Sequence, residues 1–373
     1  MMHLYEHLQK KLSERENQNA LRSLKIVTPN FIDFSSNDYL GIVKNKLCTI
    51  PAHLPSGATG SRLLSGNNEQ TEMLEAKIAH LHHAEAALLF NSGYDANVGL
   101  LSAVLQKDDV VLYDYLSHAS LRDGIRLSYA QSFSFEHNSI PSLLKKIEHA
   151  KKELKGSIYI VTESVFSMDG DKAPLKELIA VCQLHGAFLI VDEAHATGLC
   201  GPKGEGLCVE EMIEEAVFAR IVTFGKAVGC HGAAVLGGIT LINYLINFAR
   251  TVIYSTALPQ HSIAAIDCSY NLFPEMHQER SQLKKLIQYF NNINIPFTKL
   301  SSHTPIQAII IPGNSAVKRI AAFLQEKHID ARPILYPTVP KQTERLRIVL
   351  HSYNTIDELN TLSICLNEAY TVC

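Results

Sequence analysis

The chain has 373 residues, a formal net charge of −3 at pH 7 and an apolar fraction of 46%. This nearly balanced charge gives no sign of a basic surface for nucleic acid, and the length suffices for a large domain and a smaller one. The eight cysteines form no Cys-x-x-Cys pair and no metal-like spacing, which indicates reduced thiols in the cytoplasm.

The N-terminal segment is predicted to form a helix and an arm. Leucines recur with a roughly helical period over residues 3–25. Residues 1–19 are charged and lack the apolar core of a signal peptide, so we expect a soluble cytoplasmic protein. A short strand over residues 31–34 then leads into residues 35–41, which read either as an ordinary turn or as a loop that presents Asn37 to a ligand.

Two further motifs are weak signals for binding. Residues 56–66 contain three glycines among hydroxyl side chains, as phosphate loops do, but the Gly-Lys-Ser/Thr of a Walker A sequence is missing. The predicted helix over residues 69–83 carries His80, His82 and His83, which this spacing spreads around the helix surface. We therefore expect no metal site.

From residue 86 onward, apolar runs of strand length alternate with helical patterns. Such alternation predicts a mostly parallel sheet with helices on both faces. In these sheets ligands bind at the carboxyl ends of the strands, so the residues that follow each strand are informative. The predicted strands cover residues 86–90, 110–113, 157–161, 187–191 and 221–224.

The side chains that follow these strands have the chemistry of a catalytic site. Lys226 stands beside Gly225 and Ala227 after a buried strand, an environment that favours the nucleophilic neutral amine. A lysine that extends from a strand end into solvent is the alternative. Residues 192–195 also spell the helicase sequence Asp-Glu-Ala-His, but the Walker lysine of a helicase is missing. The other candidates are Gly93, Tyr94, His118, Ser167, Asp192, His195 and Thr223.

This combination fits pyridoxal 5′-phosphate (PLP). That cofactor binds covalently to a lysine, needs an acid at its pyridine nitrogen, and binds its phosphate through amides and hydroxyls. We expect Asp192 to keep the nitrogen protonated, His195 to reach the phenolate oxygen, and His118 to cover the ring. The helix start at residues 91–94, together with Thr223, is expected to hold the phosphate.

Residues 231–249 approach the length of a membrane span, but glycines and asparagines interrupt them, so a strand followed by an amphipathic helix is predicted.

The C-terminal third is predicted to form a smaller α+β domain. We divide the chain into an N-terminal helix and arm (1–45), a large PLP-binding α/β domain (46–262) and a small domain (263–373). The small domain is predicted to contain a helical segment at 260–290, strands at 306–311 and 346–350, and helices at 316–327 and 355–370.

Six strings of residues resemble the α-oxoamine synthases, which are PLP enzymes with the aspartate-aminotransferase-like fold. The matching strings occur in the same order as in the family, and the resemblance extends on both sides of them, from about residue 20 to about residue 350. It implies a large, mostly parallel sheet domain with a smaller C-terminal domain, and a homodimer with active sites at the subunit interface. The strings span residues 33–41, 117–120, 165–171, 191–198, 223–226 and 254–259.

The resemblance also implies roles for single residues. Lys226 corresponds to the Schiff-base lysine, which is also the catalytic base, and His118 to a histidine that stacks on the ring and assists proton transfer. Arg22, Asn37 and Arg347 correspond to substrate positions, and the guanidinium fork of Arg347 suits a carboxylate. The implied cofactor contacts are Gly93, Tyr94, His118, Ser167, Asp192, His195, Thr223 and Lys226, with Ser255 and Thr256 directed at the neighbouring subunit's phosphate.

The implied reaction is a decarboxylative Claisen condensation. Residues 337–340 and 345–347 resemble the branch that joins L-alanine to a pimeloyl thioester, on coenzyme A or a carrier protein, in biotin synthesis. A sister activity with glycine and another acyl-CoA, such as that of 2-amino-3-ketobutyrate CoA ligase, stays open, as do an aminotransferase and a cofactor-free NTPase or binding module. Leu335 and Tyr336 stand where the family has an arginine, so the acyl-chain contact is unassigned.

Overall fold

The computed structural model describes residues 5–26, 30–152 and 154–372. The predicted helix start at residues 3–4 lies outside this part of the chain. The chain forms two compact units. The larger unit comprises Leu40–Ser167 and Lys172–Arg280, and the smaller unit comprises Met1–Tyr39, Met168–Asp171 and Ser281–Cys373.

A seven-stranded sheet organises the larger unit, with the order β2-β8-β7-β6-β5-β3-β4. Strands β3 to β7 are parallel, and β8 is antiparallel to both of its neighbours, so β2 runs in the same direction as β7. The carboxyl ends of six strands therefore lie at one edge. The strands are β2 (Ala86–Phe90), β3 (Val110–Asp114), β4 (Gln131–Phe135), β5 (Ile158–Glu163), β6 (Phe188–Asp192), β7 (Ala219–Thr223) and β8 (Ala233–Gly237).

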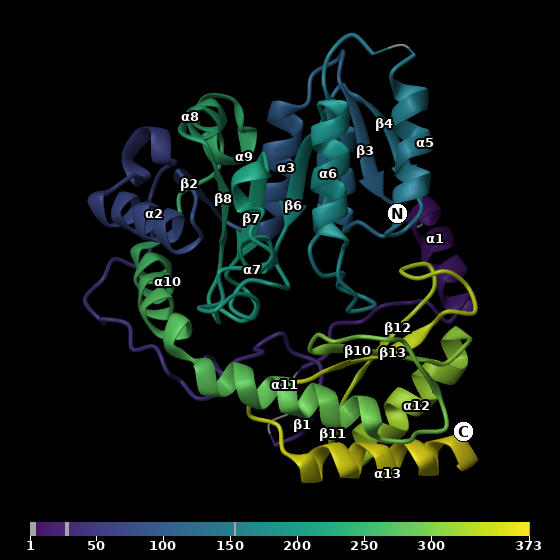
Figure 1. Ribbon diagram of the computed structural model, residues 1–373. Helices are drawn as coiled ribbons and strands as arrows, with labels where there is room; N and C mark the ends of the chain where they lie inside the picture. The colour runs from purple at the N-terminus through teal and green to yellow at the C-terminus, as the bar shows by residue number, and fades with distance from the viewer. Residues whose placement is uncertain (1–4, 27–29, 153, 373) are drawn as a thin grey trace. The chain divides into compact units, whose positions relative to one another are not determined.

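Helices cover both faces of this sheet (Figure 1). Tyr159 and Val161 of β5 pack in one apolar cluster with Leu100 of α3, and the alternate residues Ile158 and Ile160 are also buried. Since successive residues of a strand face opposite sides, neither face is open. The helices are α2 (Glu69–Leu81), α3 (Gly93–Val104), α4 (Ala119–Leu127), α5 (Ile140–Ala150), α6 (Leu175–His185), α7 (Leu207–Glu210), α8 (Ile239–Phe248), α9 (Arg250–Ile253) and α10 (Gln260–Leu272), with short turns at Arg62–Gly66, Glu214–Ala216 and Phe273–Glu275.

The smaller unit contains a four-stranded antiparallel sheet with the order β12-β13-β10-β9. A separate pair, β1 and β11, is parallel and joins the N-terminal arm to the C-terminal part of the chain. The strands are β1 (Ile32–Asp33), β9 (Thr298–Lys299), β10 (Ile306–Ile310), β11 (Ile329–Asp330), β12 (Arg332–Ile334) and β13 (Arg345–Val349). The helices are α1 (Glu6–Asn17), α12 (Asn314–Glu326) and α13 (Ile356–Val372), together with α11 (His277–Asn292), whose first residues up to Arg280 belong to the larger unit.

The predicted fold class is confirmed, with local differences. The N-terminal helix ends at Asn17, and the predicted segment 260–290 is broken at Pro274, because proline removes a helix hydrogen bond. The predicted boundary at 262 also differs from the limit of the larger unit at Arg280. Tyr270 of α10 packs against Phe224 within the larger unit, which accounts for this difference. No helix in the described ranges is long and apolar enough to cross a membrane.

Candidate functional site

The parallel strands of the larger unit bring several predicted site residues to one edge of the sheet. Asp192 ends β6, Thr223 ends β7, and Lys226 follows three residues later. His118 lies at the start of α4, in the connection that leaves β3. Glu163 ends β5 and stands opposite Asp192 in the strand register. The parallel sheet therefore places the lysine, the acid and the histidine at the same edge, as predicted.

Asp192 is buried and held at both carboxylate oxygens. Its exposed fraction is 5%. The backbone N–H of Ala194 donates to Oδ1 at 2.9 Å, and the side-chain amide of Asn97 donates to Oδ2 at 2.7 Å. Asn97 was not among the predicted site residues. Together these donors fix the direction in which the carboxylate faces.

His118 is held by its ring and by its backbone. Its Nδ1 lies 2.7 Å from Ser120 Oγ, and its backbone N–H donates to Glu163 Oε1 at 2.7 Å. Although part of the ring is open to solvent, the surrounding protein lowers the pKa of His118 through desolvation, which Asp192 opposes and Lys226 reinforces. These three ionisable groups therefore share one electrostatic neighbourhood.

Glu163 is a site residue for which no role was predicted. It is 3% exposed, and burial raises its pKa to about 8, with the neighbouring charge of Asp192 acting in the same direction. The backbone hydrogen bond from His118 and the charge of Lys226 oppose this rise. Glu163 thus holds a proton over much of the neutral range, which limits the repulsion between two adjacent carboxyl groups.

The start of α3 forms a small cradle against the end of β7. A Cβ atom on Gly93 would lie 2.6 Å from Thr223 Cγ2, so only glycine permits this approach. Thr223 Oγ1 is buried and has no hydrogen-bond partner among the described residues. The first amides of a helix have no partners within that helix. An unsatisfied hydroxyl beside a helix N-terminus fits a phosphate group.

The other predicted cofactor residues also belong to the larger unit. His195 is buried in the turn after β6, and Ser167 is half-buried in the segment after β5. The Tyr94 hydroxyl, on α3, donates to Asp123 Oδ2 at 2.5 Å. Ser255 and Thr256 line a cavity of about 20 Å³, and the Asn91 side chain at the end of β2 donates to the Thr256 carbonyl at 2.8 Å.

The three predicted substrate residues all belong to the smaller unit, which brings two of them together. Arg347 on β13 donates through Nη2 to Asn37 Oδ1 at 3.1 Å, and the buried Tyr39 hydroxyl donates to the same oxygen at 3.2 Å. Arg22 contacts another element, because its Nη2 donates to Thr338 Oγ1 at 2.9 Å. Arg347 is therefore oriented by the loop that was predicted to present Asn37.

A polar network supports this loop. Asp33 Oδ1 accepts the backbone N–H groups of Ser35 and Ser36 at 2.9 and 3.0 Å, and Asp33 Oδ2 accepts the Tyr353 hydroxyl at 3.0 Å. Burial disfavours the ionised form of Asp33, but the charge of His351 and the Ser35 and Ser36 hydrogen bonds outweigh it and lower its pKa to about 2. The loop start is therefore anchored by an ionised acid.

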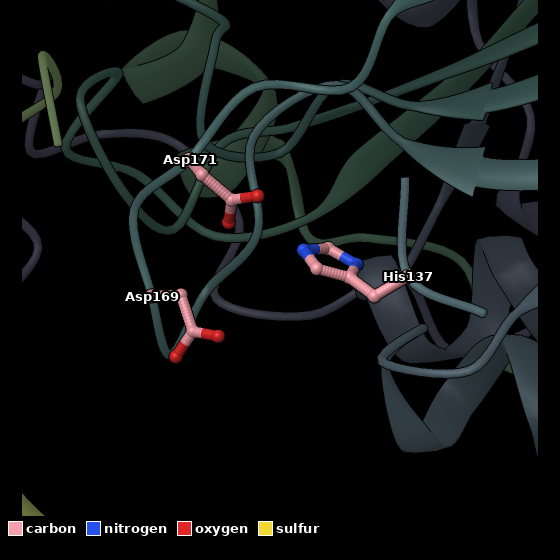
Figure 2. A group of neighbouring side chains, drawn as sticks. All are labelled: His137, Asp169 and Asp171. Carbon is pink, nitrogen blue, oxygen red and sulfur yellow. The ribbon is translucent and has the colours of Figure 1, made fainter. Parts of the chain in front are cut away.

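Figure 2 shows Asp169, Asp171 and His137, three side chains of the kinds that bind metal ions. The two aspartates belong to the smaller unit and His137 to the larger one. Within its own unit, Asp169 pairs with Arg345, and His137 Nδ1 lies 2.9 Å from Asp114 Oδ1. These contacts account for Asp169 and His137, and the trio carries no metal assignment.

The chain is similar to PLP enzymes over almost its whole length. Residues 29–361 match the family described as aminotransferase class I and II. A curated 8-amino-7-oxononanoate synthase from Emericella nidulans is 38% identical over 96% of this chain and 94% of its own. A serine palmitoyltransferase from S. paucimobilis, solved with bound PLP–myriocin, has a TM-score of 0.86 at 25% identity, covering 98% of this chain and 97% of its own. An 8-amino-7-oxononanoate synthase from Francisella tularensis has a TM-score of 0.73 at 27% identity, covering 92% and 99%.

Proposed function

Because the chain belongs to the class I and II aminotransferase family and is a PLP-dependent acyltransferase, we propose that it condenses L-alanine with a pimeloyl thioester. The products would be 8-amino-7-oxononanoate, carbon dioxide and the free thiol of the acyl carrier. The observation that carries this proposal is the 38% identity, across 96% of the chain, with a relative named for that activity.

The residues at the sheet edge fit the cofactor. Asp192 would accept a hydrogen bond from the pyridinium nitrogen, and such charge-assisted bonds contribute about 1.5–3 kcal/mol. Thr223 and the first amides of α3 would bind the phosphate, which gives the buried Thr223 hydroxyl its missing partner. His195, Ser167 and Tyr94 would complete the contacts, with Ser255 and Thr256 serving the second subunit of a homodimer. When bound, PLP supplies an electron sink for a carbanion at the amino-acid Cα.

Lys226 would serve first as the anchor of the cofactor and then as the base. Its Nζ would take the proton from the Cα of alanine, which leaves that carbon able to form a bond with the thioester carbonyl carbon. The carbon–sulfur bond then breaks and the thiol leaves, and the former alanine carboxylate leaves as carbon dioxide. Lys226 would return a proton to the same carbon.

Two further side chains would control the substrates. Arg347 would hold the alanine carboxylate with its planar fork, in an orientation set by Asn37. Arg22, beside Thr338, would contact the acyl substrate. His118 would cover the ring and donate a proton toward the thioester carbonyl oxygen, where negative charge develops.

The closest rival is a sister condensation with glycine, and serine palmitoyltransferases are also structural neighbours. Purified, PLP-loaded enzyme should be given pimeloyl-CoA with L-alanine, glycine or L-serine in turn. We expect thiol release and a product of the mass of 8-amino-7-oxononanoate with alanine alone. Turnover that prefers glycine or serine would refute the substrate assignment, and a keto acid without thiol release would indicate an aminotransferase.

A further inference from the structure

Four side chains form a continuous hydrogen-bonded chain between Asp192 and His118. Asn97 Nδ2 lies 2.7 Å from Asp192 Oδ2 and 2.9 Å from Ser120 Oγ, and Ser120 Oγ lies 2.7 Å from His118 Nδ1. Asp192, Asn97 and Ser120 are each at most 5% exposed. Asp192 at the end of β6 and His118 in the connection after β3 are therefore linked through the facing helices α3 and α4.

The direction of each hydrogen bond in this chain is determined by its donors. The amide nitrogen of Asn97 has two hydrogens, and a carboxylate oxygen can only accept, so Nδ2 donates to Asp192 and also to Ser120 Oγ. The reversed amide would place two oxygens 2.7 Å apart. Since Ser120 Oγ accepts from Asn97, its own hydrogen is available for His118 Nδ1.

A second contact independently requires Nδ1 to be an acceptor. The backbone N–H of Ser120, in the first turn of α4, donates to His118 Nδ1 at 3.3 Å. A backbone amide has no lone pair to offer, so the ring nitrogen that it faces must carry no hydrogen. Two donors therefore converge on Nδ1, and the neutral imidazole has its hydrogen on Nε2.

We propose that Asn97 and Ser120 are positioning residues that couple Asp192 to His118 and hold the imidazole in the Nε2–H tautomer. This inference rests on the proposed function, in which His118 donates a proton to the acyl substrate. A neutral imidazole can donate only from the nitrogen that carries the hydrogen, and the fixed Nδ1 leaves Nε2 for that task. Asn97 has a second effect, because it orients the carboxylate that faces the cofactor ring.

The tautomer can be measured directly on the PLP-loaded protein by 15N-detected NMR with labelled histidine, using His118→Gln to assign the signals. Without any substrate, we expect His118 Nδ1 to resonate as an unprotonated ring nitrogen and Nε2 as a protonated one near pH 7. A protonated Nδ1 in the wild-type protein would overturn the proposal. The result does not depend on which amino acid or thioester is used, so it is separable from a failure of the substrate assignment.

Variants separate this role from simple packing. Ser120→Ala removes the hydroxyl donor but keeps the backbone N–H, so we expect the 15N signal of Nδ1 to move as it loses a hydrogen bond, and the pH profile of turnover to shift. Asn97→Ala should weaken PLP binding about tenfold or more, as expected when a donor to a buried charge is lost. Ser102→Ala is the matched control, because its hydroxyl donates to the Val98 carbonyl on the same helix α3 and lies outside the chain of contacts. If Ser120→Ala retains the wild-type Nδ1 signal and pH profile, the proposal is wrong, even if Asn97→Ala fails to fold.

Discussion

Burial changes the charge of Glu163, and this has a measurable effect on stability. Its pKa in the folded protein is about 8, above the ordinary value of 4.5. Glu163 therefore contributes stability that is fully present below pH 4.5 and is lost as the pH rises through 8. We expect the free energy of unfolding to fall by about 3 kcal/mol more in the wild type than in Glu163→Gln between pH 5.5 and 8.5.

Urea denaturation of the cofactor-free protein at those two pH values provides the measurement. Glu148→Gln, a change at an exposed glutamate, is the control and should behave like the wild type. Parallel pH dependences for the wild type and Glu163→Gln would contradict the prediction. Such a result would mean that Glu163 is ionised without cost in the folded state.

Lys226 is expected to be essential for chemistry but not for folding. The Lys226→Ala protein should lose all condensation activity and keep its unfolding midpoint near that of the wild type, because the side chain is only half-buried. Treatment of the wild type with borohydride should attach the cofactor to the peptide that contains residue 226, as detected by mass spectrometry. Measurable turnover by the alanine variant would remove the lysine from its proposed role.

Arg347 is expected to select the carboxylate of the amino acid. Its Nη2 is directed by Asn37, and a lysine at this position would keep the charge but lose the planar fork. Arg347→Lys should raise the KM for alanine about tenfold, with a smaller change in the KM for the thioester. Steady-state kinetics with each substrate varied in turn gives both values. A change confined to the thioester would assign Arg347 to the other substrate.

At the scale of elements, we expect the contact between α3 and β7 to control cofactor affinity. A methyl group at residue 93 would collide with Thr223 Cγ2 and displace the helix start. Gly93→Ala should weaken PLP binding by about tenfold or more, measured by titration of the cofactor-free protein. Adding Thr223→Ser removes Cγ2 but keeps the hydroxyl, so the double variant should recover part of the affinity. If the double variant binds no better than Gly93→Ala, steric conflict with Cγ2 is not the cause.

Within the larger sheet, the sequence predicts the strands that are continuous apolar runs and misses the one that is not. Five apolar runs correspond to β2, β3, β5, β6 and β7, and residues 231–249 do contain a strand and a helix, β8 and α8. Strand β4 escaped prediction because Gln131–Phe135 alternates polar and aromatic residues at the edge of the sheet. A continuous apolar run is easier to detect than a strand with exposed polar residues.

The candidate site was predictable only for residues that come at the ends of strands, because parallel topology places those ends at one edge of the sheet. Lys226 and Asp192 follow strands directly, so parallel topology sufficed to place them at one edge. Asn97 and Ser120 lie within helices, and their connection depends on how α3 packs against α4. The spacing of residues along the chain contains no signal for that packing. Ser120 had only a weak local signal, two residues after His118.

At the scale of the whole molecule, the proposed homodimer makes a test by complementation possible. If Ser255 and Thr256 bind the phosphate in the other subunit, Lys226→Ala and a Ser255→Ala/Thr256→Ala double variant should each be inactive or weak alone. Mixing them under conditions of subunit exchange should restore about a quarter of the sites, because half of the dimers are hybrids with one intact site. Failure to recover activity, with exchange verified by mass spectrometry, would place both residues in the same subunit as the lysine they serve.

The smaller unit is assembled from three separated stretches of sequence. Strand β11 pairs with β1 from the N-terminal arm, and the hydroxyl groups of Ser302 and Thr304 donate to the carbonyl of Gly170. A fragment that begins at residue 281 would lack both partners. During synthesis on a ribosome, the arm and residues 168–171 must therefore wait for the last quarter of the chain to be translated, whereas every strand of the larger sheet has by then already emerged.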